Sequence, residues 1–348
     1  MAKKTEQSAG LQILKSDIKE KRPSRLYFFY GEETFLLHHY LQQLRKLLID
    51  ELTESFNFHK LTDETFNIRS FADAVENLPM MAENTMVLVD EVDIFKLNES
   101  DREKLVEILT DIPEYCTVVF TYETIEWKPD KRYKKLYDAV TDKGLQIEFA
   151  KQDQRDLVAW ITRHFVSNKK RISPDLCVYL IDITGGTMTA LAGEISKICA
   201  YSDADEIVKS DIDAVTEPVM DAVVFQMTEL LGKGQAGPAL VKLKQLLKMQ
   251  EEPPVILGAI GSHFRKLAAA KVLADNGKQA GELMRLYRIS DYGARKTMES
   301  ARRFSERFYK LASELVLETD YHLKTSFDAP ERLLEVLVLR LAREARND

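Results

Sequence analysis

Apolar residues in the first 150 positions follow two spacings. Mostly apolar runs, typical of strands in a sheet covered on both faces, occupy residues 26–30, 86–91, 116–121 and 145–149, and the second run ends in two carboxylates. Before and between these runs, apolar residues recur every three or four positions, as on one helix face. They are Leu11, Leu14 and Ile18; Leu37, Tyr40, Leu41, Leu44 and Leu48; Phe71, Ala74, Val75 and Leu78; Leu105, Ile108 and Leu109; and Tyr133, Leu136, Tyr137 and Val140. This alternation predicts an α/β domain with a parallel sheet covered on both faces.

Two local signals set helix ends in this region. The helix that contains Phe71 must end before Pro79, because proline disfavours helical backbone in the residue that precedes it. Ser100 and Glu103 have the spacing of a capping box, which predicts that a helix begins at Ser100.

Beyond Lys151 the strand pattern nearly disappears. Ser173 followed by Pro174 is a typical helix start, and Gly185–Gly186 ends that helix. These helix signals predict a small helical bundle that extends to about Thr216.

From Asp221 to the end, the pattern predicts helices throughout. The last helix, ERLLEVLVLRLAREA, is apolar over more than half of its circumference. Such a helix needs neighbours on several sides, either in its own domain or on other subunits.

Length and composition narrow the class of protein. A chain of 348 residues is too long to fold around one ordinary hydrophobic core, so two or three domains are expected. The chain is 45% hydrophobic and 30% charged, which is typical of a soluble globular protein. It has no run near the roughly 18 consecutive apolar residues of a membrane span, and its first ten residues lack the apolar core of a secretory signal. We therefore expect a cytoplasmic protein.

Cysteine and histidine spacings do not favour a metal site. Cys116, Cys177 and Cys199 share no C-x-x-C spacing, and the six histidines form no H-x-x-x-H pair. Neither a disulfide framework nor a bound metal is expected.

Charge is distributed unevenly along the chain. Residues 51–120 hold 16 acidic and 5 basic residues, whereas residues 261–310 hold 12 basic and 5 acidic ones. Four basic residues in the second region recur at roughly helical spacing: Arg295, Lys296, Arg302 and Arg303. They would suit contacts with DNA phosphates, and a solvated helix face explains them equally well.

The turn after the first strand has the position of a nucleotide-binding phosphate loop. Such a loop needs a second glycine and a G-K-[ST] ending, because backbone N–H groups, a lysine and a hydroxyl hold the phosphates and Mg²⁺. Gly31 is followed instead by Glu32, Glu33 and Thr34, so carboxylates stand where an anion would bind. We do not expect this turn to bind ATP.

The segment VLVDE at residues 87–91 has the form in which ATPases present a Mg²⁺ ligand and a water-activating carboxylate. Any buried strand that meets an acidic loop produces the same pattern. Without a phosphate loop, a catalytic role for Asp90 and Glu91 is not favoured.

Met80 and Met81 lie in or beside a short connection after Pro79. One interpretation is that they fold back under the helix and fill gaps in the core. The other is that they form an adaptable binding surface, where methionine is a favoured residue.

Seven segments, in this order and spacing, resemble the delta subunit family of the bacterial DNA polymerase III clamp loader. They are RLYFFYGEETFLLHHYLQQL, ENLPMMAENTMVLVDE, TVVFTYE, KRYKKLYDAV, ITGGTMTALAGEISKICAYS, ILGAIGSHFRKLAAAKVL and ETDYHLKTSFDAPERLLEVLVLRL. The resemblance implies an AAA+-like fold with a lost phosphate site, in which Gly31 is a turn glycine. It implies a RecA-like domain over residues 1–150, a helical lid over 151–216 and a helical collar over 217–348.

The resemblance also implies a function. The family binds the ring-shaped sliding clamp and opens it for loading onto primed DNA, through an apolar pair that matches Met80 and Met81. That pair often includes an aromatic residue, so Met-Met implies shallower insertion and lower affinity. The implied partners are the clamp (beta), the gamma/tau and delta prime type loader subunits, and primed DNA.

The resemblance implies no cofactor, because ATP would be bound by the partner subunits. No catalysis by this chain alone is expected, although it would belong to a DNA-directed DNA polymerase complex. Two alternatives remain: an active AAA+ ATPase subunit of a replication or repair complex, which would bind Mg-ATP, and a free-standing DNA-binding adaptor.

Overall fold

The computed structural model describes residues 2–287, 289 and 291–348. The chain divides into two compact units, Met1–Gln152 and Asp153–Asp348, which are described separately below. The first boundary lies close to the expected one at residue 150. The further division between a lid and a collar at residues 216 and 217 stays a prediction.

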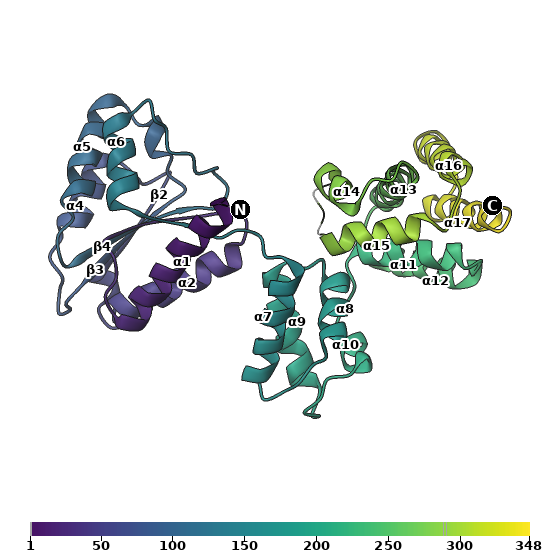
Figure 1. Cartoon of the computed structure of the whole chain (residues 1–348), viewed down its shortest axis with the longest axis horizontal. Helices are drawn as coiled ribbons and strands as arrows, with labels where there is room; N and C mark the ends of the chain where they lie inside the picture. Colours follow the sequence, from purple (N-terminus) through teal and green to yellow (C-terminus); the bar gives the residue numbers. More distant parts are fainter. Residues whose placement is uncertain (1, 288, 290) are drawn as a thin grey trace. The chain divides into compact units, whose positions relative to one another are not determined.

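The first unit is built on a five-stranded parallel sheet (Figure 1). Its strands are β1 (Leu26–Tyr30), β2 (Phe58–Thr62), β3 (Thr85–Asp90), β4 (Cys116–Tyr122) and β5 (Leu145–Glu148), in the order β2-β3-β4-β1-β5. The sequence pattern therefore placed four of the five strands and the parallel arrangement. It missed β2, an edge strand whose residues are only partly buried or exposed, so no apolar run marks it.

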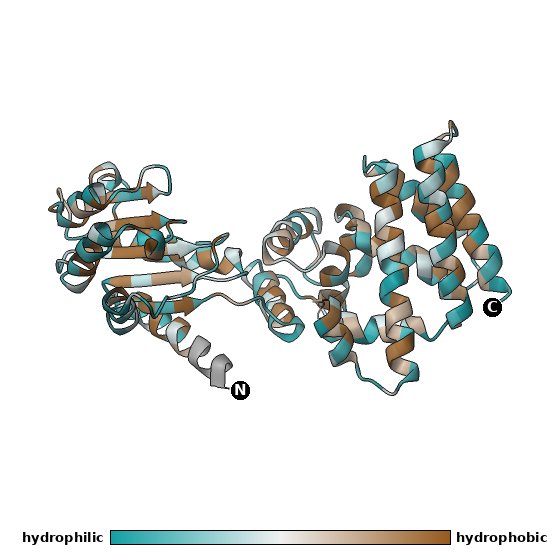
Figure 2. Cartoon of the chain, turned by 90° about the horizontal axis from the view of Figure 1, so that it is seen from above, coloured by the Kyte–Doolittle hydropathy of each residue, from teal (hydrophilic) through white to brown (hydrophobic). Residues whose placement is uncertain are grey.

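Helices cover both faces of this sheet. They are α1 (Ala2–Glu20), α2 (Thr34–Leu48), α3 (Glu54–Asn57), α4 (Ile68–Glu76), α5 (Glu99–Thr110) and α6 (Lys134–Asp138), with the short helices η1 (Ile94–Lys96) and η2 (Ala139–Lys143). Side chains of α4, α5 and α6 form one apolar cluster with Phe28 and Phe120, and side chains of α1 and α2 form another with Tyr27 and Phe29. Alternate residues of β1 thus point to opposite faces, and Figure 2 shows hydrophobic residues along the strands.

The expected capping box at Ser100 is wrong. The helix begins at Glu99, and Asn98 is its N-cap, because Asn98 Oδ1 accepts a hydrogen bond from Asp101 N at 2.9 Å. Asn98 stands three residues before Asp101 and so satisfies a free N–H of the first turn. Ser100 lies inside that turn.

The second unit is helical throughout its elements. The helices are α7 (Gln154–Ser167), α8 (Pro174–Thr184), α9 (Met188–Tyr201), α10 (Lys209–Val215), α11 (Met220–Gly232), α12 (Ala236–Lys248), α13 (Pro253–Asp275), α14 (Ala280–Tyr287), α15 (Asp291–Ala301), α16 (Glu306–Thr325) and α17 (Pro330–Arg346). The predicted ends of α8 are confirmed: the Ser173 hydroxyl accepts from Leu176 N, and Gly185 closes the helix with φ +79°. The predicted combination of an α/β sheet and an all-α region is therefore confirmed.

The last helix, α17, finds its neighbours within its own unit. Its apolar face is buried in the core that α11, α12, α13 and α16 share, through Leu334, Leu337, Val338, Leu341 and Ala342. Most of its apolar surface is thus covered without another subunit.

A membrane-spanning helix in the described residues would have to be long and strongly apolar. No single helix there is long and apolar enough to cross a bilayer, although α8 and α9 together, bent by 119°, pass the same test of length and composition.

Candidate functional site

Gly31 joins β1 to α2 through a close backbone contact. Its φ of +129° is a conformation that side chains rarely adopt, and a Cβ on residue 31 would lie 2.4 Å from the Phe149 carbonyl oxygen. The same oxygen accepts a hydrogen bond from Glu33 N at 2.9 Å. The glycine is therefore needed for packing against the chain that leaves β5.

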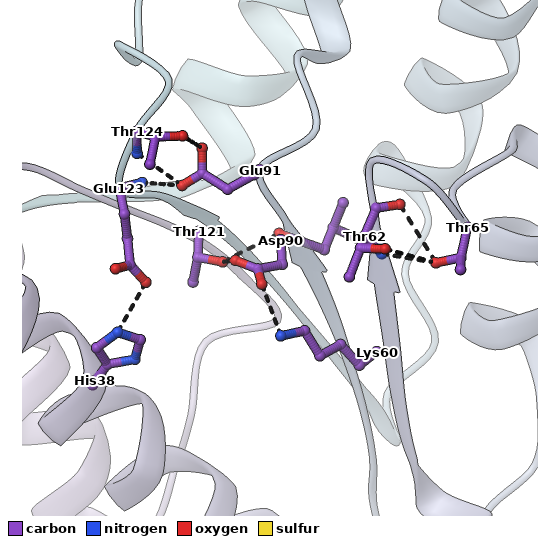
Figure 3. A network of polar contacts seen from close by, with 10 residues as sticks. His38, Lys60, Thr62, Thr65, Asp90, Glu91, Thr121, Glu123 and Thr124 are labelled. Atoms are coloured by element: carbon purple, nitrogen blue, oxygen red, sulfur yellow. Dashed lines mark hydrogen bonds and ion pairs between the residues drawn. The ribbon is translucent and has the colours of Figure 1, made fainter.

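Asp90, at the end of β3, is engaged by two neighbouring strands (Figure 3). Lys60 Nζ of β2 lies 2.8 Å from Asp90 Oδ2, and the Thr121 hydroxyl of β4 donates to Asp90 Oδ1 at 2.8 Å. Partial burial raises the pKa of Asp90, but the hydrogen bonds from Lys60 and Thr121 outweigh it and hold that pKa below its usual value. Asp90 is thus an ionised partner of Lys60, a half-exposed lysine of the edge strand.

Glu91 binds the loop that follows β4 (Figure 3). Its carboxylate accepts hydrogen bonds from Glu123 N, from Thr124 N at 3.0 Å, from the Thr124 hydroxyl at 2.7 Å and from Ile125 N at 2.9 Å. Burial raises the pKa of Glu91, but these hydrogen bonds together lower it by more, so the pKa lies below its usual value. The φ of Glu91 is +58°, in the left-handed region that is uncommon for residues other than glycine.

The two carboxylates of the VLVDE segment therefore have internal partners. Asp90 is paired with a cation, and both oxygens of Glu91 accept from the 123–125 loop. Their arrangement fixes the carboxyl edge of the sheet. It does not present two free oxygens to a metal ion or a water molecule.

Met80 and Met81 lie on the loop between α4 and β3, as expected. Met81 is 95% exposed and Met80 is 53% exposed. The interpretation that they fill gaps in the core is therefore wrong. Pro79 and the short distance to β3 leave the loop at the surface, where neither side chain reaches the apolar cluster under α4.

A buried residue from another segment holds this loop. Asn57, which is 0% exposed, donates from Nδ2 to Met80 O at 2.9 Å and accepts on Oδ1 from Met80 N at 2.8 Å. The sequence pattern missed Asn57, and a polar residue 23 positions away from Met80 carries no local signal of this contact.

Exposed apolar residues gather in the two segments that Asn57 joins. The first unit has six large apolar side chains that are exposed among its described residues, and five of them belong to these segments: Leu52, Phe56, Leu78, Met80 and Met81. Single exposed apolar residues are ordinary, whereas a group of them is typical of a binding surface.

The four basic residues expected to face DNA are not one free patch. Arg295 pairs with Asp291 at 2.7 Å, Lys296 with Asp182 at 2.6 Å, and Arg303 with Glu229 at 2.6 Å. The helical spacing expected for them also fails, because α15 ends at Ala301 and the two arginines lie in the turn beyond it.

Comparisons with known proteins find similarity to one family over most of the chain. Residues 27–148 match the family described as "DNA polymerase III, delta subunit", and residues 221–341 match "DNA polymerase III delta subunit, C-terminal domain". The chain is 25% identical over 339 residues to DNA polymerase III subunit delta of Bacillus subtilis (strain 168), covering 95% of this chain and 97% of that protein. It is 21% identical over 281 residues to the probable DNA polymerase III subunit delta of Aquifex aeolicus (strain VF5), covering 78% of each.

A solved structure has the same fold. The Bacillus subtilis DNA clamp loader delta protein (YqeN) superimposes with a TM-score of 0.66 and 23% identity, covering 95% of this chain and 98% of that one. The sequence matches and the shared fold both extend from the sheet to the last helix. The chain belongs to the delta subunit family of DNA polymerase III.

Proposed function

We propose that this chain is a clamp-loader subunit that binds the ring-shaped sliding clamp through Met80 and Met81 and holds the ring open for loading onto primed DNA. The observation that carries the proposal is the exposure of this apolar pair on a loop tied to the sheet edge by Asn57. Membership of the delta subunit family supports the same function.

The proposed action requires no covalent chemistry. A protein that binds the open ring better than the closed ring shifts that equilibrium by its differential affinity and no more. Methionine suits such a contact, because its unbranched side chain adapts to a pocket of irregular shape.

In this proposal ATP binds to partner subunits of the gamma/tau type, and a delta prime type subunit completes the loader. The internal pairing of Asp90 and Glu91 supports this division of labour. It disfavours the alternative of an active AAA+ ATPase, which would need those carboxylates to hold Mg²⁺ and activate water.

Contact with DNA by the basic residues of the second unit is a separate part of the proposal. Binding a phosphate through Arg295, Lys296 or Arg303 would exchange an internal carboxylate for an external anion. Arg302 is exposed, and none of the ion pairs between described residues includes it. We therefore assign Arg302 the leading role among the four.

The test is binding of the purified chain to the cognate sliding clamp. Burial of one methionine side chain contributes roughly 1.5–3 kcal/mol, so the pair contributes at most about 3–6 kcal/mol before ordering costs. Met80→Ala with Met81→Ala should weaken clamp binding by roughly a hundredfold or more, a factor of ten being about 1.4 kcal/mol. The melting temperature should change little, because both side chains are exposed.

Ile13→Ala is the matched control. Ile13 is an exposed apolar residue of α1 in the same unit, and its loss should leave clamp affinity unchanged. Clamp affinity of the double variant within about threefold of wild type would reject the proposed contact.

A further inference from the structure

The loop that carries Met80 and Met81 has little structure of its own. In the described part of the chain, the backbone groups of residues 78–84 make no hydrogen bond with other backbone groups. Pro79 also lacks an N–H to donate. Hydrogen bonds that fix this loop must therefore come from side chains.

Asn57 supplies two such bonds to one residue. Its amide donates to Met80 O and accepts from Met80 N, which is the pairing that a neighbouring strand would offer. Only one orientation of the amide satisfies both bonds, because the acceptor oxygen must face the N–H group. Met80 is thereby held at both of its backbone polar groups.

Asn57 lies in a segment that packs against the sheet edge and against α2. Asn57 ends α3 and is followed directly by β2, whose Phe58 lies opposite Met86 of β3 in the parallel register. Glu54 of α3 forms an ion pair with Arg45 of α2, and the Arg45 guanidinium lies 4.3 Å from the centre of the Phe58 ring. Asn57 thus connects the loop to the edge of the sheet.

The backbone of Met81 shows why an anchor is needed. Its φ of +53° lies in the left-handed region, which is uncommon for residues other than glycine. Such a conformation persists only where the surroundings enforce it. The two hydrogen bonds between Asn57 and Met80 hold the residue directly before Met81 and so enforce this conformation.

We propose that Asn57 is the positioning residue of the clamp-binding loop, which it holds in the binding conformation before the clamp arrives. This inference rests on the proposed function of Met80 and Met81. A loop that is ordered in advance loses less conformational freedom on binding, so more of the contact energy is available for affinity. The bonds involve only the backbone of Met80, so side-chain substitutions at Met80 and at Asn57 act on separate steps.

The first experiment measures the free chain. Asn57→Ala should accelerate amide hydrogen exchange at Met80 and through residues 81–84, because the Met80 N–H loses its acceptor. Asn57→Asp keeps that acceptor but places a second carboxylate oxygen against Met80 O in a fully buried site, so its exchange should also exceed that of the wild type. Unchanged exchange in both variants would overturn the anchoring role, whatever the clamp measurements show.

The second experiment measures clamp affinity. Asn57→Ala and Asn57→Asp should each weaken binding roughly fivefold to tenfold, because each loses the donor to Met80 O. Ile147→Val is the control for general destabilisation, since Ile147 is buried in β5 at the opposite edge of the sheet from β2. It should keep its affinity within about twofold. An equal loss of affinity in the control would show that Asn57 acts only through stability.

A double-variant cycle separates this inference from the proposed function. In a background of Met80→Ala with Met81→Ala, adding Asn57→Ala should change clamp affinity by less than about twofold, because there is no longer a contact to position. A further loss as large as in the wild type would overturn the positioning role. If exchange accelerates as expected but the methionine variant binds the clamp normally, the proposed contact is wrong and the anchor is right.

Discussion

Lys60 Nζ lies 2.8 Å from Asp90 Oδ2, so the acidic residue at the end of β3 is paired with a lysine of the neighbouring edge strand. The position of Asp90 is that of a metal ligand in an ATPase. The ion pair with Lys60 gives Asp90 a structural role instead. The phosphate-loop residues G-K-[ST] are also missing after Gly31.

We therefore predict that the purified chain neither binds nor hydrolyses ATP. A labelled nucleotide should show no saturable binding in the micromolar range in the presence of Mg²⁺. Asp90→Ala should leave clamp loading by the assembled complex nearly intact. Micromolar nucleotide binding that weakens in the Asp90 variant would contradict the prediction and favour the ATPase alternative.

DNA contact is expected to depend on Arg302 more than on its paired neighbours. Arg302→Ala in the assembled loader should weaken DNA binding and reduce the slope of log affinity against log salt by about 1, the value for one phosphate contact. Arg295→Ala is the comparison, because Arg295 already pairs with Asp291. Equal effects of the two substitutions would show that the ion pair does not decide the contact.

Assembly with other subunits should use exposed apolar residues of the second unit. Leu317 and Tyr321, four residues apart on α16, are exposed by 69% and 64%. Replacing both by alanine should reduce incorporation into the loader by about tenfold or more without lowering the melting temperature. Tyr201→Ala, an exposed position on α9, is the control.

Removal of α17 would be a poor test of the same question. Leu334, Leu337 and Leu341 are buried in the core of their own unit, so truncation after Pro330 should unfold that core. If the Leu317 and Tyr321 variant enters the complex normally, another face must join the subunits.

Stability should depend on pH through His263 of α13. Burial first, and the nearby Lys266 second, lower the pKa of His263 to about 4. An unfolded histidine has a pKa near 6.5. Between these values the unfolded chain binds a proton that the folded chain does not, so the free energy of unfolding falls as pH falls from about 6.5 to 4. The loss from this group is at most about 3 kcal/mol, because His263 is only partly buried.

Urea unfolding of the chain at several pH values measures this effect. His263→Gln should lose stability at neutral pH, since its edge-to-face contact with Phe225 is changed. The difference in unfolding free energy between wild type and variant should shrink from pH 7 to pH 4. A difference that stays constant over this range would mean that His263 keeps an ordinary pKa.

The sequence alone determined the elements whose signals are local. The apolar runs of β1, β3 and β4 identify strands buried on both faces, because nearly every residue of such a strand meets apolar neighbours. The run of β5 also marked a strand, although β5 lies at the edge of the sheet and is only partly buried. The absence of a lysine after Gly31 is equally direct, since phosphate binding needs that side chain. The exposed position of Met80 was left open, because an apolar residue near a helix end can face either way.

Only the tertiary structure decided which distant residues meet. Asn57 binds Met80, and Lys60 binds Asp90, across separations of 23 and 30 positions, through the pairing of β2 with β3. Because β2 is an edge strand with partly exposed residues, its sequence has no apolar periodicity from which that pairing could be predicted. The loop anchor and the pairing of Asp90 therefore follow from where β2 lies in the folded sheet, which is a property of long-range packing.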